Sequence, residues 1–329
     1  MNIIIISMRV WALKYLKECF SEDQLKNVTL ITDKMNIELK SFLKLENIKC
    51  IKTSNLTINT LKKIDIKNSV IISAGSPWIF KEKFIKKLGK NFYNVHQSPL
   101  PSMRGSVASY IILYDIRAFQ ACLHRVTPGI DTGNVVYRKS FIVPSVLKTP
   151  LEINNFLHKK NREMVKEFVN KIYKKQKLIE EKQNYFFSNY NARLLSDVNG
   201  WIDWSHEVDD LDRFIRSYGD PYDGAKTFIH DKQVNIKYIE KSMQDAARHP
   251  DEVGRVLRKF EDYVIVSVNK GSIYIKNIIW KNKNIISQIK SGDKFYTKIK
   301  YLDLKSRRVK FINNNKKIFN QKTSLVKLK

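Results

Sequence analysis

Apolar runs separated by polar stretches predict strands joined by helices in the first hundred residues. Residues 1–6 (MNIIII) form a continuous apolar run typical of a buried strand, and segments 28–32, 48–51 and 69–72 repeat this pattern. Between the first two strands, Val10–Phe20 carries apolar residues at helical spacing. Strands that alternate with helices predict a mostly parallel sheet covered on both faces.

A long helix is predicted further along the chain by its cap and its apolar stripe. Thr149, Pro150 and Glu152 form a capping-box signature, with proline at the first helical position. Apolar residues recur at helical spacing from Phe156 to Tyr173 and predict a core-facing side. The charged and polar run 174–184 then predicts a connection out of the first domain.

From residue 227 onward the apolar segments become short and β-like, which predicts a small barrel or an open sheet. They are 228–229, 234–238, 253–257, 264–268 and 273–279. We therefore expect an α/β fold, in which a Rossmann-like, mostly parallel sheet domain (1–190) precedes a smaller β-rich domain (191–300). Residues 301–329 are expected to form a basic tail, either a flexible surface segment or an electrostatic contact for anionic lipid or nucleic acid.

Composition limits the classes of function. The 329 residues carry a formal net charge of +28, which attracts polyanions without choosing between RNA, a nucleotide-sugar and an acidic membrane surface. Cys19, Cys50 and Cys122 lack metal-ligand or CxxC spacing, which indicates a reducing cytoplasm, no structural disulfide and no metal site. The run Ile3–Ile6 is too short for a signal peptide, and no transmembrane segment is expected. No GxGxxG follows the first strand, so dinucleotide binding of the usual kind is unsupported.

The candidate chemistry lies between residues 91 and 133. Asn94 and His96 are two apart on an expected strand, so their side chains share one face at its carboxyl end. Asp131 follows in a glycine-containing loop. A histidine can take a proton, a carboxylate can orient it, and an amide can donate to an oxyanion, which suits acyl transfer to an amine without a metal. An Asn-x-His in a strand is also common as a purely structural feature.

Flanking motifs decide between these alternatives. The strings NVHQSPLP, Arg104-Gly105 and LHRVTPGIDTG resemble the signature of the formyltransferases that use 10-formyltetrahydrofolate. The resemblance implies that Asn94, His96 and Asp131 are the catalytic set. One departure is Pro99, where many members carry leucine.

The resemblance also implies the residues that hold the folate. The loop SAGSPWIF (73–80) corresponds to a wall of the pterin pocket, although Pro77 could equally start a helix and Trp78 pack on the sheet. His124 also matches the family pattern and is expected to have a structural or an orienting role. The cofactor-binding residues implied are Gly75, Pro77, Trp78, Ile79, Ser98, Leu100, Pro101, Gly129 and Ile130.

The strings NGWIDW and SYGDPYDGA resemble the sugar N-formyltransferases of O-antigen biosynthesis more than the tRNA enzyme. This resemblance implies a lipopolysaccharide-pathway acceptor, a nucleotide-linked (dTDP) amino sugar, and contacts to it from Arg104, Gly105, Arg216, Tyr218 and Tyr222. Arginine suits pyrophosphate and tyrosine suits stacking, but a helix stop packed between domains explains the last three equally well. A cytoplasmic homodimer that binds folate and no DNA is expected.

Three functions remain open. The first is sugar N-formyl transfer, with His96 as the base. The second is methionyl-tRNA formyl transfer, which the charge favours; its family usually has a basic, proline-containing insertion after the second strand, whereas residues 33–48 are short and proline-free. The third is a non-catalytic RNA-binding relative, which would need none of the three catalytic residues.

Overall fold

A computed structural model describes residues 1–242 and 249–306 of the chain, and residue contacts divide it into two units. Unit 1 comprises residues 1–105, 118–142 and 156–190, and unit 2 comprises 106–117, 143–155 and the described chain from Asn191 onward. The sequence-based boundaries at residues 190 and 300 stay a prediction. No pattern in the sequence predicts that 106–117 and 143–155 join the second unit. Of the expected basic tail, residues 307–329 lie outside the described residues.

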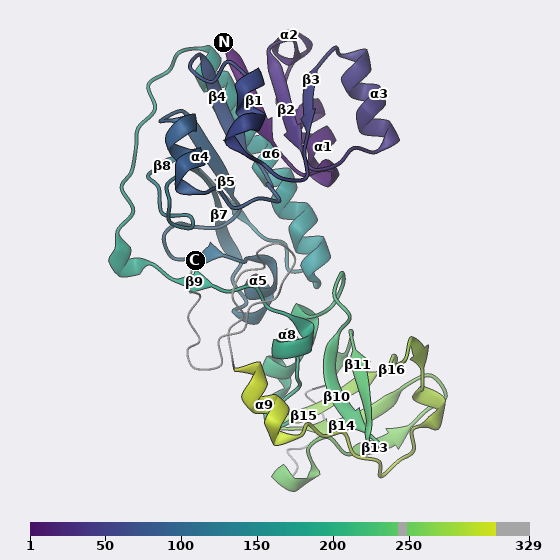
Figure 1. The fold of residues 1–329 in the computed structure, drawn as a ribbon. Helices are drawn as coiled ribbons and strands as arrows, with labels where there is room; N and C mark the ends of the chain where they lie inside the picture. Colours follow the sequence, from purple (N-terminus) through teal and green to yellow (C-terminus); the bar gives the residue numbers. More distant parts are fainter. Residues whose placement is uncertain (243–248, 307–329) are drawn as a thin grey trace. The chain divides into compact units, whose positions relative to one another are not determined.

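Unit 1 is built on a seven-stranded sheet of order β3-β2-β1-β4-β5-β7-β8 (Figure 1). Strands β3, β2, β1, β4 and β5 are paired in parallel, whereas β7 and β8 run antiparallel to their neighbours. The mostly parallel α/β sheet predicted from the sequence is therefore confirmed, and the predicted strands match β1 to β4 within one residue. The bounds are β1 Asn2–Ile6, β2 Val28–Thr32, β3 Lys49–Lys52, β4 Ser69–Ser73, β5 Phe92–His96, β7 Ala118–Arg125 and β8 Val135–Ile142.

Alternating side chains of the strands feed two separate cores, one on each face of the sheet. Ile3 and Ile5 pack on one face with apolar residues of α1, α3 and α6, and Ile4 and Ile6 pack on the other with residues of η1 and α4. Figure 1 shows the long helix α6 crossing one face. The helices are α1 Arg9–Cys19, α2 Glu22–Leu25, α3 Ile37–Leu45, the 3₁₀ turn η1 Ile58–Lys63, α4 Glu82–Leu88 and α6 Pro150–Tyr173.

The predicted start of α6 is confirmed in atomic detail. The Thr149 hydroxyl accepts the Glu152 N–H at 3.3 Å, and the Glu152 carboxylate accepts the Thr149 N–H at 2.9 Å. This reciprocal pair satisfies backbone donors that no helical carbonyl can reach.

Unit 2 combines short helices with two antiparallel four-stranded sheets, of order β10-β11-β16-β17 and β12-β15-β14-β13. The predicted β-rich C-terminal part is confirmed, as two sheets and not one. The prediction of a strand at 253–257 was wrong in its bounds. Gly254 has φ +82°, which no extended strand has, and the observed strand spans Val256–Lys259. The strands are β10 Ala225–Ile229, β11 Lys232–Ile236, β12 Glu240–Ser242, β13 Val256–Lys259, β14 Val264–Val268, β15 Gly271–Ile275, β16 Ile279–Trp280 and β17 Lys283–Asn284.

The remaining elements are short. The helices of unit 2 are α5 Ala108–Leu113, α7 Ser196–Asn199, α8 Val208–Ser217 and α9 Ile299–Lys305, with 3₁₀ turns η3 Pro250–Glu252 and η4 Ile286–Gln288. After α6, an irregular connection leads through the 3₁₀ turn η2 Tyr185–Phe187 to β9 Tyr190–Asn191, which pairs with β6 Arg104–Gly105. This connection also bridges to β8, since Glu181 pairs with Val135.

Candidate active site

Asn94 and His96 lie on β5 with the alternation that the sequence predicts. Tyr93 and Val95 belong to the core on one face, and Phe92 belongs to the core on the other. Asn94 and His96 therefore share the face of Phe92, at the carboxyl end of the strand. In the register of β5 with the antiparallel strand β7, Asn94 lies directly opposite His124. A cross-strand pair of this kind brings the two side chains into contact.

Asp131 comes from the loop between β7 and β8, and its backbone has φ +52°, an unusual value for a residue with a side chain. The turn is closed by a 2.7 Å hydrogen bond between the hydroxyls of Thr127 and Thr132. A Cβ at Gly133 would run into the carbonyl of Arg125, so only glycine fits there. The loop thereby turns the Asp131 carboxylate back toward β5 and β7.

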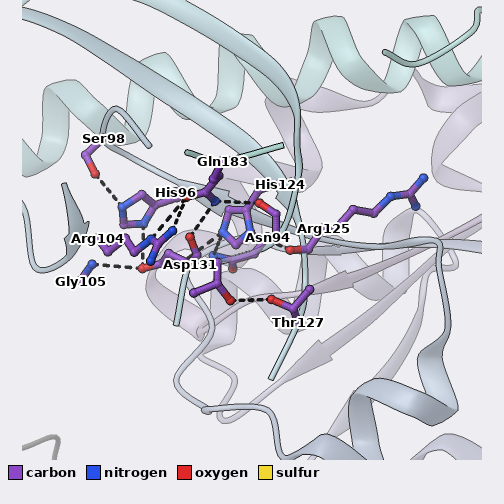
Figure 2. A network of polar contacts seen from close by, with 12 residues as sticks. Asn94, His96, Ser98, Arg104, Gly105, His124, Arg125, Thr127, Asp131 and Gln183 are labelled. Atoms are coloured by element: carbon purple, nitrogen blue, oxygen red, sulfur yellow. Dashed lines mark hydrogen bonds and ion pairs between the residues drawn. The ribbon is translucent and has the colours of Figure 1, made fainter. Parts of the chain in front are cut away.

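The three predicted residues meet, and His124 joins them (Figure 2). Asp131 Oδ2 lies 3.5 Å from His96 Nδ1, and Asp131 Oδ1 lies 3.4 Å from His124 Nε2. Asn94 Nδ2 lies 3.2 Å from His124 Nε2. The Gly105 N–H donates to Asp131 Oδ2 at 3.1 Å. One carboxylate thus contacts two histidines, and a role for His124 stays a prediction.

Fixed acceptors surround the two imidazoles. His124 Nδ1 lies 2.7 Å from the Arg125 carbonyl, which can only accept, so this nitrogen carries a proton. His96 Nε2 lies 2.8 Å from the Met103 carbonyl, and the Ser98 hydroxyl contacts both groups. His96 therefore has an oxygen acceptor beside each ring nitrogen. Such a ring can take up a second proton and have both N–H groups paired.

Asp131 is held as an anion. Burial alone would raise its pKa, but the opposing charge of His96 and the hydrogen bond from the Gly105 N–H hold the pKa of Asp131 well below its usual range. The side chain is 13% exposed, which makes it more open than either histidine. The site therefore keeps a negative charge ready beside a histidine that can become positive.

Gln183 supports the loop and was not found from the sequence. Its amide donates to the carbonyls of Asp131 at 2.8 Å and Gly133 at 2.7 Å. Its oxygen accepts from Arg104 Nη2 at 2.7 Å (Figure 2). In the sequence it is one polar residue in a charged connection, and no local pattern singles it out. Arg104, expected to touch substrate, is buried and makes this contact instead of facing solvent.

The loop after β4 carries the four residues of this segment that the resemblance assigns to the folate pocket, and that role stays a prediction. Gly75 has φ +67°, a Cβ added there would lie 3.2 Å from the Trp11 ring, and its carbonyl accepts the Met8 N–H. Trp78 packs on the core of unit 1 and donates its indole N–H to the Ser54 carbonyl at 3.3 Å. Pro77 and Ile79 are exposed.

The other expected folate residues fall into a buried and an open group. Ser98 and Leu100 are buried, and Leu100 packs against Cys122. The Ser98 hydroxyl is used inside the protein, on His96. Pro101 and Ile130 are half-buried, and Gly129 is exposed.

The substrate residues expected in unit 2 are mainly engaged with their own unit. Arg216 forms a two-pronged ion pair with Asp212, at 2.9 and 2.7 Å. Tyr218 is 3% exposed and belongs to the core. Tyr222 is half-buried. Arg216 and Tyr218 thus have structural contacts within unit 2. A role of these two residues or of Tyr222 in substrate binding stays a prediction.

Within residues 1–242 and 249–306, no group of three or more His, Cys, Asp or Glu side chains is arranged to hold a metal ion. Among the helices described, none has the length and apolar content needed to cross a bilayer.

A family model for the C-terminal domain of formyl transferases matches residues 195–291. A methionyl-tRNA formyltransferase of Desulfotalea psychrophila is 28% identical over 186 residues, which cover 56% of this chain and 55% of that protein. The bifunctional polymyxin resistance protein ArnA of Wigglesworthia glossinidia brevipalpis is 26% identical over 275 residues, which cover 79% of this chain and 39% of that protein. The match thus spans about half or less of these curated relatives.

Solved structures share the fold. An N-formyltransferase of Helicobacter canadensis, in complex with folinic acid and dTDP-3-aminofucose, aligns with a TM-score of 0.61 at 20% identity, covering 85% of this chain and 100% of that one. WlaRD, a sugar 3N-formyl transferase studied with dTDP and 5-N-formyl-THF, aligns with a TM-score of 0.60 at 21% identity, covering 86% and 98%.

Proposed function

We propose that this chain is a formyl transferase, which transfers the formyl group of 10-formyltetrahydrofolate to the amine of a nucleotide-linked amino sugar. The observation that carries the proposal is the contact of Asp131 with both His96 and His124, beside Asn94. These groups supply a proton acceptor, a fixed negative charge and an amide donor around one place.

The reaction would proceed by direct attack of the amine. The amine nitrogen forms a bond to the formyl carbon, and the carbonyl oxygen gains negative charge, which the second N–H of Asn94 can stabilise. The nitrogen gives up a proton to His96, whose imidazolium is then paired with Asp131 and with the Met103 carbonyl. The bond from carbon to N10 of the folate breaks as the oxyanion collapses. That nitrogen takes up the proton, and tetrahydrofolate leaves.

His124 acts on this step through its neighbours. With a proton fixed on Nδ1, its Nε2 can accept one N–H of Asn94, which sets the orientation of the amide. The other amide N–H is then left for the oxyanion.

The segment after β2 supports the choice of a sugar, and not tRNA, as the acceptor. Residues 33–48 contain the short helix α3, capped by the Asn36 side chain on the Leu39 N–H at 3.0 Å. This compact segment differs from the basic, proline-containing insertion expected in a tRNA enzyme. The sugar N-formyltransferases with the same fold are covered over almost their full length. Thymidine diphosphate as the nucleotide, a cytoplasmic homodimer and a place in O-antigen synthesis belong to the same proposal.

Methionyl-tRNA formyl transfer is the second candidate. The net charge of +28 and the name of the D. psychrophila relative favour it.

One labelling experiment separates the two. We would supply 10-formyltetrahydrofolate labelled in the formyl group with either methionyl initiator tRNA or a panel of dTDP-linked amino sugars. We expect label on a sugar amine, and loss of transfer by orders of magnitude in His96→Asn but not in His206→Asn, a half-exposed histidine of unit 2. Label on tRNA alone would overturn the sugar proposal, and full activity of His96→Asn would overturn the role of His96.

A further inference from the structure

Three consecutive aromatic side chains stand exposed on the connection that follows α6. Tyr185, Phe186 and Phe187 form the 3₁₀ turn η2 and are 58%, 88% and 63% exposed. The other exposed large hydrophobic residues of the described chain occur singly along the sequence, which is ordinary for a protein surface. A run of three aromatics is not ordinary and indicates a contact surface. We call these three residues the aromatic ledge.

Local contacts fix the conformation of the aromatic ledge. The Asn184 side chain accepts the Phe186 N–H at 3.0 Å and fixes the start of the turn. The rings of Phe186 and Phe187 lie edge to face, with centroids 5.3 Å apart and an interplanar angle of 89°. The Arg104 guanidinium lies 4.9 Å from the centroid of the Tyr185 ring and occupies one of its faces. Phe186 is therefore the ring most open to a ligand.

The ledge is also tied to the catalytic loop within unit 1. Gln183, two residues before Tyr185, donates to the carbonyls of Asp131 and Gly133 and accepts from Arg104. Arg104 thus contacts both Gln183 and the ring of Tyr185. Two residues span at most about 7 Å of chain, so Tyr185 lies within that distance along the chain from Gln183, whose side chain contacts the Asp131 loop.

We propose that the aromatic ledge is the stacking site for the nucleobase of the acceptor. This inference rests on the proposed function, in which the amine proton passes to the pair of His96 and Asp131. The acceptor then approaches from the Asp131 side, the side to which Gln183 ties the ledge. A nucleobase is a flat heteroaromatic ring that stacks on phenylalanine with little dependence on its identity. The base would hold the remote end of the acceptor while its amine reaches the site.

Direct binding measurements test this without requiring turnover. Calorimetric titration of the full chain with thymidine diphosphate should show Kd weakened roughly 5- to 150-fold in Phe186→Ala, the range that loss of one stacked base (about 1–3 kcal/mol) gives. Phe186→Trp should restore binding. The matched control is Ile179→Ala, which truncates an 81% exposed apolar residue of the same connection. The Kd for 5-formyltetrahydrofolate should stay unchanged in every variant.

Three results would overturn the inference. Phe186→Ala with thymidine diphosphate affinity within twofold of the parent would show that no base stacks there. Weaker folate binding with unchanged nucleotide binding would assign the ledge to the pterin. A change of oligomeric state in sedimentation, with unchanged nucleotide affinity, would assign it to a second copy of the chain. If nucleotide binding depends on Phe186 but no sugar is formylated, the ledge stands and the proposed function fails.

Discussion

Replacing Asp131 by Asn removes one negative charge and keeps nearly the same shape, so it isolates the electrostatic part of the proposed mechanism. The carboxylate lies 3.5 Å from His96 Nδ1. A unit charge pair at that distance is worth about 5 kcal/mol at an effective dielectric constant of about 20. The asparagine amide can still hydrogen-bond, which returns about 1 kcal/mol. The net loss of about 4 kcal/mol predicts a fall in kcat of roughly a thousandfold.

Steady-state formyl transfer, followed as release of tetrahydrofolate at saturating donor and acceptor, measures this change. Asp23→Asn is the matched control, because Asp23 is 90% exposed and pairs with Lys26 on the surface. Circular dichroism and a thermal melt should show that Asp131→Asn stays folded. A folded Asp131→Asn enzyme whose kcat is within threefold of the parent would refute the reasoning.

Four further predictions concern stability. The pKa of Asp131 is lowered in the folded state, so its carboxylate adds to the free energy of unfolding above the ordinary aspartate pKa of ~4. This stabilisation is lost as the pH falls through the lower folded pKa. Urea melts should show the loss in the parent and not in Asp131→Asn. Burial lowers the pKa of His158 to about 3, so on acidification the unfolded chain binds the proton first. The free energy of unfolding should therefore fall as the pH drops from ~6.5 toward that value, by up to about 1.4 kcal/mol per pH unit. His158→Phe, which can still stack on Trp11, should lack this pH dependence. Gln183→Leu should lower the free energy of unfolding by about 2–4 kcal/mol, because it leaves two loop carbonyls without a donor, and a urea midpoint equal to the parent's would contradict this. Phe168→Ala should cost about 3–5 kcal/mol in the same assay, since the ring is fully buried between α6 and the sheet; a loss under ~1 kcal/mol would mean that the site collapses around the smaller side chain.

The periodic part of the fold was predictable because it depends on local pattern. The apolar run at residues 1–6 and its repeats predicted β1 to β4, and the capping box predicted the start of α6. The period of two placed Asn94 and His96 on one face of β5. These features need only the chain's own geometry and a core to bury its apolar side.

The assembly of the site was not predictable in this way. Spacing could not show that β7 runs antiparallel to β5, which sets His124 opposite Asn94. Nor could it show that Gln183, fifty-two positions after Asp131, holds that loop by two hydrogen bonds. The positive φ of Asp131 likewise depends on closure of the loop around Gly133.

The order of the amino acids alone shows which residue types are available for acyl transfer and which elements carry them, because periodicity and capping are local. The contact of one carboxylate with two histidines depends on the folded arrangement, because strand pairing and loop closure bring together groups that the chain keeps far apart.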